Sequence, residues 1–252
     1  MKYTFYTGIV AALVQANAAN AQVAGITEMP KTLPVSAPVA EQIEPNSKPT
    51  MNEYQIRLAH AKELLGKYFD KSIVGKSVKK NPAVAAYDTY IKDSFEKAFK
   101  KKHGGRFAKV AGEVAKTLVE ESVRYGFDPL FLMAVIENES SFNPLVRGTS
   151  GEIGLMQILP DTAAWIAKNS GLPYAGAKTL EDPVQNIRLG AAYIAYLREK
   201  FDSHGQLYLA AYNMGSGNVK RYLASKTMPK VYPTRVMKRY VRFYTEISSR
   251  TL

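Results

Sequence analysis

Residues 132–160 read LMAVIENESSFNPLVRGTSGEIGLMQILP, and the rest of the chain is organised around them. An apolar run that carries two carboxylates, Glu137 and Glu139, ends at Asn143-Pro144. A glycine-rich loop follows, and a second apolar run comes after it. A carboxylate at the end of an apolar helix, facing a loop with amide and glycine groups, is the arrangement that cleavage of a glycosidic bond requires.

Glu139 ends an apolar stripe on the helix that we expect over 129–141. It follows Leu132, Val135 and Ile136 at the spacing i, i+3, i+4, i+7, so the four residues share one face. Glu137 is about 200° away around the helix, and the two carboxylates therefore cannot face one cleft. Burial against apolar groups would raise the pKa of Glu139 and let it act as a general acid. Spacing alone leaves open an exposed Glu139 in the last turn.

Composition narrows the class of protein and the kind of site. The chain has 252 residues, of which 46% are hydrophobic, enough for one ordinary domain plus extra material. A net charge of +12 favours a polyanionic environment such as nucleic acid, anionic lipid or cell wall, or a generally basic soluble protein. The absence of cysteine excludes disulfides and thiolate metal sites, and the three histidines lack ligand spacing. We expect no metal and no cofactor.

The first 51 residues have the pattern of an export signal and a linker. Lys2 precedes an apolar stretch at 5–14, and the sequence Ala-Asn-Ala at 19–21 fits a cleavage site. Residues 1–21 are expected to be a signal peptide, cleaved after Ala21, and residues 22–51 a proline-rich linker. The mature protein is expected in the periplasm or outside the cell, with no transmembrane segment.

Apolar stripes at helical spacing recur from residue 52 onwards and predict an all-α fold. We divide this part into a basic helical segment, 52–104, and a main domain, 105–252. The expected inner face of the first helix carries Tyr54, Leu58, Ala61, Leu65 and Tyr68. Further helices are expected to start at Asp128-Pro129, Pro160, Asp182-Pro183 and Thr234, and 153–158 is the one candidate for a strand.

Four motifs occur in a fixed order. They are ESSFNP at 139–144, GLMQILP at 154–160, AYNMGSG at 211–217 and Tyr240-Val241. Together they resemble the catalytic domain of the soluble lytic transglycosylases, a branch of the lysozyme superfamily, over roughly 105–247. The resemblance implies an α-rich, lysozyme-like fold for this part of the chain.

The resemblance also implies a reaction. The expected activity is cleavage of the β-1,4 bond between N-acetylmuramic acid and N-acetylglucosamine in peptidoglycan, for remodelling or local opening of the wall. Glu139 would be the single catalytic acid and then the base, and the C6 hydroxyl would attack to give a 1,6-anhydro product. Peptidoglycan strands are the expected partner. Secretion or conjugation machinery is a further candidate partner, since enzymes of this type often open the wall for transenvelope machines.

The motif positions imply contacts with substrate for a further set of residues. They are Ser140, Met156, Gln157, Leu159, Tyr212, Asn213 and Tyr240. Gln157 is expected to line the sugar cleft, with Met156 and Leu159 nearby. Tyr212 is expected to approach Glu139 or the substrate acetamido group, and Tyr240 to close the cleft. Asn213 would bind sugar or fix the turn. For each of these residues, the sequence is also compatible with a packing role.

The sequence departs from the family pattern in the loop after Asn143-Pro144, and also before Tyr240-Val241, where Lys238-Arg239 stand in place of a usual acidic residue. Two of the departures lie in the loop. Gly148 stands where a serine is usual, and Glu152 stands where an alanine is usual. Ser150 or Thr149 would have to supply the missing hydroxyl. A second carboxylate could position water, which would favour hydrolysis as in goose-type lysozymes.

Two non-enzymatic functions are also compatible with the sequence. The first is a non-catalytic subunit that binds the cell wall and keeps the fold, against which the intact Glu139-Ser140 pair argues. The second is a basic nucleic-acid binder, although no nucleic-acid recognition motif accompanies the charge.

Overall fold

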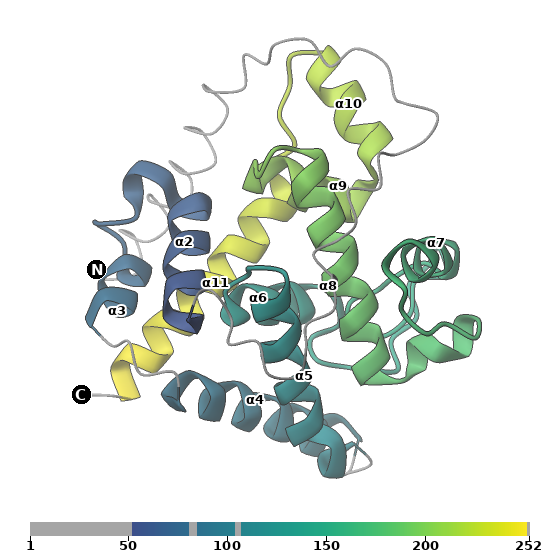
Figure 1. Ribbon diagram of the computed structural model, residues 1–252, viewed down its shortest axis with the longest axis horizontal. Coiled ribbons are helices and arrows are strands. Elements are labelled where there is room, and N and C mark those ends of the chain that lie inside the picture. Colours follow the sequence, from purple (N-terminus) through teal and green to yellow (C-terminus); the bar gives the residue numbers. More distant parts are fainter. Residues whose placement is uncertain (1–51, 81–84, 104–106, 251–252) are drawn as a thin grey trace.

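The computed structural model describes residues 52–80, 85–103 and 107–250, which form a set of packed helices around one hydrophobic core (Figure 1). The expected signal peptide, 1–21, and linker, 22–51, lie outside the described residues. No helix in the described part of the chain is both long enough and apolar enough for a membrane span.

The helices account for nearly all of the regular structure. They are α2 (Glu53–Leu65), η1 (Gly66–Tyr68), α3 (Ile73–Lys80), α4 (Ala85–His103), η2 (Ala108–Val110), α5 (Ala111–Arg124), α6 (Pro129–Ser140), α7 (Pro160–Ser170), η3 (Ala177–Glu181), α8 (Pro183–Lys200), α9 (Gly205–Met214), α10 (Ser216–Ala224) and α11 (Val231–Arg250). Pairing of extended chain in the described residues is limited to isolated bridges of Ile153 with Arg147 and with Ile158. The predicted all-α class is confirmed, and the candidate strand is reduced to these bridges.

Acidic caps followed by proline begin two of the helices that build the site. Asp128 accepts a hydrogen bond from the backbone N–H of Leu130 at 3.0 Å, and Asp182 accepts one from Val184 at 2.8 Å. Each side chain satisfies an N–H group that has no partner inside its helix, and proline is favourable at the first helical position. The starts predicted at 129, 160 and 183 are confirmed.

Helix α11 starts earlier than the sequence suggested. It begins at Val231 rather than at Thr234, so Tyr232 and Pro233 belong to its first turn. A proline in the first turn loses no helical hydrogen bond, which explains why the helix extends through it. The earlier start places Tyr232 on the helix that packs across α6.

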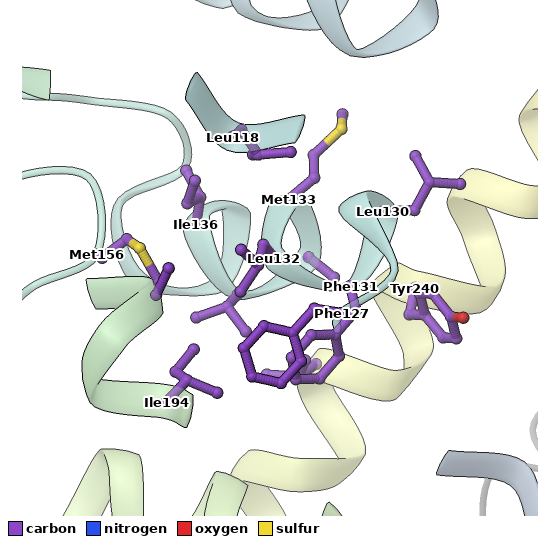
Figure 2. Packing of buried hydrophobic residues seen from close by; sticks show 14 of the residues in the cluster. Leu118, Phe127, Leu130, Phe131, Leu132, Met133, Ile136, Met156, Ile194 and Tyr240 are labelled. Atoms are coloured by element: carbon purple, nitrogen blue, oxygen red, sulfur yellow. The ribbon is translucent and has the colours of Figure 1, made fainter. Parts of the chain in front are cut away.

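Helix α6 lies in the centre of the core. Every residue from 130 to 136 has no exposed surface, so this helix has no solvent face along most of its length. Figure 2 shows its side chains surrounded by Leu118 of α5, Met156, Ile194 of α8 and Tyr240 of α11. Because the helix is apolar all round, hydrophobic spacing carries little information about which of its faces bears the functional group.

The N-terminal cap of α6 is also the centre of a buried polar network. Asp128 is fully buried, and its Oδ2 accepts hydrogen bonds from the hydroxyls of Tyr240, at 2.7 Å, and Tyr244. Arg57 of α2 lies with its Nε 4.0 Å from Asp128 Oδ1. The backbone N–H of Asp128 donates to Nδ1 of His60, also from α2, at 3.0 Å. Helix α2 therefore supplies two of the side chains that surround the cap residue Asp128.

This network determines which face of α2 is buried. Arg57 and His60 are 1% and 0% exposed, whereas Tyr54 and Leu58 of the predicted inner face are only partly buried. Ala61 and Leu65 of the predicted face are buried, so the prediction is confirmed in part. The buried face also includes Arg57 and His60, two polar residues that turn inward to meet Asp128. Burial, followed by the positive charge of Arg198, holds the pKa of His60 well below its usual value and keeps the ring neutral.

The described residues of the 52–104 segment pack directly on the main part of the chain. Phe95 and Phe99 of α4 are fully buried, and the ring of Phe95 lies 5.2 Å from that of Phe142, just beyond the end of α6. Arg198 of α8 is ion-paired with Glu63 of α2. The hydrophobic core therefore contains residues on both sides of position 105, where the sequence suggested a boundary.

Replacement of Asp128 by alanine should lower the free energy of unfolding by about 3–5 kcal/mol, since it removes a cap and the buried carboxylate that faces Arg57. Urea denaturation measures the change. Asp182→Ala is the matched control, because Asp182 caps α8 at an exposed position and its loss should cost only about 1 kcal/mol. Equal losses in the two variants would show that the buried network adds nothing to the cap.

Candidate active site

Glu139 lies in the last turn of α6, where the chain reverses sharply. Ser141 and Phe142 follow with φ values of +49° and +62°, a left-handed conformation that residues other than glycine rarely adopt. Phe142 is buried against Phe95, and Asn143 Oδ1 accepts a hydrogen bond from the N–H of Leu145 at 3.0 Å. Packing thus holds a costly turn in place directly after the helix turn that carries Glu139.

The environment of Glu139 favours its protonated form. Burial raises the pKa of Glu139 to about 7, and the negative charge of Glu152 adds to the increase. A hydrogen bond from the Tyr232 hydroxyl to Glu139 Oε1 and the positive charge of Arg235 act in the opposite direction but do not cancel burial. A carboxyl group with a pKa near 7 can both donate and accept a proton at neutral pH.

Glu137 lies in a different environment on the other side of the helix. Its Oε2 is ion-paired with Arg242 and lies 3.4 Å from Nε of Arg239, both on α11. The two carboxylates of α6 therefore point to different partners, as their spacing indicates. Glu137 joins α6 to α11, and Glu139 is the one in a position to exchange a proton with a ligand.

The loop that faces Glu139 is fixed by two amide side chains. Gln157 has a φ of +47°, and its Nε2 donates to the carbonyl oxygens of Val146 at 3.0 Å and Gly154 at 2.9 Å. Asn186 of α8 is fully buried, and it accepts from the N–H of Met156 at 2.8 Å and donates to the carbonyl of Ile153 at 2.9 Å. The loop is therefore held in one conformation before any ligand arrives.

The two departures in the loop occupy one place in the structure. A Cβ atom added to Gly148 would overlap the carboxylate of Glu152 and lie 2.9 Å from its Cδ. The same carboxylate accepts a hydrogen bond from the N–H of Ser150 at 3.0 Å. Glu152 thus fills the space next to Gly148, and its carboxylate would have to move to make room for a side chain at 148. The result is a second carboxylate whose charge acts on Glu139.

Tyr212 of α9 completes the site. Its hydroxyl donates to the carbonyl oxygen of Met156 at 2.6 Å, which ties α9 to the loop. Burial, and then the charge of Glu139, raises the pKa of Tyr212 well above its usual value, so its hydroxyl keeps its proton. Tyr212 therefore approaches Glu139, but its proton is directed at the backbone of Met156.

Residues 117–232 match the family model described as Transglycosylase SLT domain. These residues form a transglycosylase domain of the SLT family. The match includes Glu139 and Tyr232 and stops before Tyr240. The resemblance that the sequence motifs indicated is confirmed.

Individual relatives also match part of the chain. A putative soluble lytic murein transglycosylase from Haemophilus influenzae is 40% identical over 94 residues, which cover 37% of this chain and 16% of the relative. Membrane-bound lytic murein transglycosylase C from Histophilus somni is 34% identical over 128 residues, which cover 45% of this chain and 35% of the relative. The chain thus spans about a third or less of these relatives.

Among solved structures, the 70 kDa soluble lytic transglycosylase from Escherichia coli is 23% identical to this chain, with a TM-score of 0.45. The alignment covers 75% of this chain and 32% of that one.

Three of the predicted substrate contacts have buried side chains, namely Ser140, Met156 and Tyr240. Ser140 donates to the carbonyl of Ile136 at 3.0 Å, and Met156 packs against Gly190 with no exposed surface. Tyr240, which was expected to close the cleft, is fully buried and bonds Asp128. The observed contacts place Ser140 and Met156 in support of the helix and loop, and Tyr240 in support of the cap. A contact of these three residues with substrate stays a prediction.

Tyr232 is the functional candidate that the sequence did not reveal. Eight residues of α-helix span about 12 Å, so Tyr240 and Tyr232 meet opposite ends of α6, and Tyr232 is the one at Glu139. The proline after Tyr232 suggested a helix start beyond it. A Tyr-Pro pair in a possible first turn was the available signal.

The remaining predicted contacts stay candidates. Leu159 is 39% exposed and Asn213 is exposed at the end of α9, so both are accessible to a ligand. Gln157 is half-buried beside Gly148, with its amide nitrogen committed to the loop. In the described residues, no three His, Asp or Glu side chains come together as a group that could bind a metal ion.

The raised pKa of Glu139 predicts a particular dependence of stability on pH. Between the ordinary value of 4.5 and about 7, the folded state keeps a proton that the unfolded chain loses, so stability falls as the pH rises through this window. Glu139→Gln removes that loss and should be more stable than the wild type at pH 8, by on the order of 2 kcal/mol, with little difference at pH 4.5. Urea unfolding at both pH values measures the difference.

Glu137→Gln is the control for this prediction, since it removes an ion pair with α11 and should not stabilise the protein at either pH. If Glu139→Gln follows the wild-type dependence on pH, the side chain of Glu139 is not held in its protonated form.

Proposed function

We propose that this chain is an exported lytic transglycosylase that cleaves the β-1,4 bond between N-acetylmuramic acid and N-acetylglucosamine in peptidoglycan. The observation that carries the proposal is the position of Glu139 within the SLT domain. Glu139 is half-buried at the end of α6, burial raises its pKa to about 7, and its Oε1 accepts a hydrogen bond from the Tyr232 hydroxyl. Such a carboxyl group is suited to protonate a leaving oxygen.

The proposed reaction uses one carboxyl group twice. Glu139 transfers its proton to the glycosidic oxygen, the bond from that oxygen to the anomeric carbon breaks, and the bonding electrons stay with the departing N-acetylglucosamine. The C6 hydroxyl oxygen of the muramoyl sugar then bonds to the anomeric carbon. Its proton passes to the carboxylate of Glu139, which restores the acid. No water is consumed, and the product carries a 1,6-anhydro ring.

The surrounding residues would position this acid. Tyr232 donates to Oε1 of Glu139, so the transferable proton belongs on Oε2. Tyr212 donates to the carbonyl of Met156, and Gln157 donates to the carbonyl of Val146, so these two residues hold the loop near the acid in one conformation. The acetamido group of the substrate is proposed to stabilise the positive charge that develops at the anomeric carbon.

The proposed location follows from the sequence. The signal peptide expected at 1–21 would bring the protein to the periplasm or the exterior, where peptidoglycan lies. The net charge of +12 suits an acidic wall polymer. Wall remodelling or local opening, including opening for secretion or conjugation machinery, is the process that we propose for such an enzyme.

A hydrolytic outcome is a second candidate, and Glu152 is the observation that favours it. Its carboxylate occupies the space above Gly148, and its charge acts on Glu139. A carboxylate there could orient a water molecule toward the anomeric carbon. The oxygen of that water would replace the C6 hydroxyl as the attacking atom, and the product would carry a reducing end instead of an anhydro ring.

Mass spectrometry of products from purified peptidoglycan tests the proposal. The wild-type protein should release muropeptides with 1,6-anhydro ends, and Glu139→Gln should release about 10³-fold less material, since it lacks the acid. Glu137→Gln is the matched control and should keep most of the activity, because Glu137 faces α11.

Reducing ends in place of anhydro ends would replace the proposed reaction by hydrolysis. If Glu139→Gln released as much material as the wild type, both proposed reactions would be refuted, since each uses Glu139 as the acid.

A further inference from the structure

A row of aromatic side chains leads away from the candidate active site. Tyr212 contacts Tyr193 with a centroid distance of 5.4 Å, and Tyr193 stacks on Tyr196 at 6.5 Å with an angle of 16° between the rings. Tyr196 contacts Trp165 at 4.8 Å. The four residues come from α9, α8 and α7, and α8 lies between the other two helices (Figure 1). We call them the aromatic row.

The row runs from the site to solvent. Besides burial, the charge of the nearby Glu139 carboxylate raises the pKa of Tyr212, so this end of the aromatic row lies at the candidate active site. The three tyrosines are half-buried, and Trp165 at the far end is 37% exposed. Because three successive ring contacts separate Tyr212 from Trp165, the row is longer than one sugar ring.

Polar groups lie along the same surface. Lys200 Nζ donates to the Tyr196 hydroxyl at 2.9 Å and to Ser216 Oγ at 3.2 Å, and it lies 5.2 Å from the centre of the Tyr196 ring. A strip of partly exposed rings edged by a cation and hydroxyls offers apolar faces together with hydrogen-bonding groups. Sugar rings present the complementary pattern, with apolar C–H faces and hydroxyl edges.

We propose that the aromatic row is a binding surface for the glycan strand, which holds sugar units beyond the two that flank the cleaved bond. The proposal rests on the function proposed above, since a polymer substrate must continue past the reacting bond. It assigns a preference for long glycan strands to this protein, with Trp165 as the outer contact.

A purely structural role, in which the row only packs α7 against α8, is the competing interpretation. Packing accounts for the half-buried tyrosines, but it does not account for an indole left 37% exposed at the end of the row. A single exposed aromatic side chain is common on protein surfaces. Trp165 is informative because it continues an unbroken series of ring contacts that starts at Tyr212. The two interpretations differ in what a glycan does to Trp165.

Trp165 is the only tryptophan in the chain, so its fluorescence reports on this surface alone. We would titrate full-length Glu139→Gln with uncrosslinked glycan strands, which that variant should bind without cleaving. The emission of Trp165 should change and saturate as strands are added. Sedimentation of the same variant with glycan strands, without any change in emission, would overturn the proposal.

Kinetics with substrates of two lengths provide the second test. Trp165→Ala should raise KM for long strands about tenfold and leave KM for a single pair of disaccharide units unchanged. Trp165→Phe should restore most of the affinity. Tyr222→Ala is the matched control, because Tyr222 is 44% exposed on α10, outside the row, and its loss should change neither KM.

An equal rise in KM for both lengths would mean that Trp165 only supports the fold. An unchanged KM for long strands would refute the proposed binding surface. In both cases the wild type would still cleave glycan, and the proposed function would stand. A wild type that cleaves neither substrate would refute the proposed function itself.

Discussion

Helix α6 is buried on every side, and each of its ends carries an acidic side chain that accepts hydrogen bonds from tyrosines of α11. Tyr232 bonds Glu139 at the C-terminal end, and Tyr240 and Tyr244 bond Asp128 at the N-terminal cap. The two helices therefore run in opposite directions along each other. Burial of α6 raises the pKa of Glu139, and the same burial requires Asp128 to be fully paired.

The N-terminal helices belong to this arrangement. Arg57 and His60 of α2 contact the cap residue Asp128. Phe95 of α4 packs against Phe142, which lies in the turn that follows Glu139. Both ends of α6 thus depend on residues that precede the SLT domain match at 117. The basic segment that the sequence set apart is a structural support of the candidate site.

Sequence patterns that involve only neighbouring residues predicted the helices well. They did not predict contacts between residues that are far apart in the sequence. Helix starts at Asp128 and Asp182 followed from cap chemistry, which acts over a few residues. The buried face of α2 did not follow from local chemistry, because Arg57 turns inward toward Asp128, which lies 71 positions later in the chain. The motifs selected Glu139 but also Tyr240, since a motif fixes a position without showing what the side chain contacts. The sequence presented Gly148 and Glu152 as two separate departures from the family pattern. In the structure, the carboxylate of Glu152 lies next to Gly148.

The most direct test of an acid at Glu139 is the pH dependence of kcat/KM for cleavage of soluble glycan strands. The protonated form is active in the first step, so the rate should fall above a pKa of about 7, and Glu152→Gln should move this fall to lower pH by removing a negative charge. A rate that stays level up to pH 9 would contradict a buried carboxyl acid.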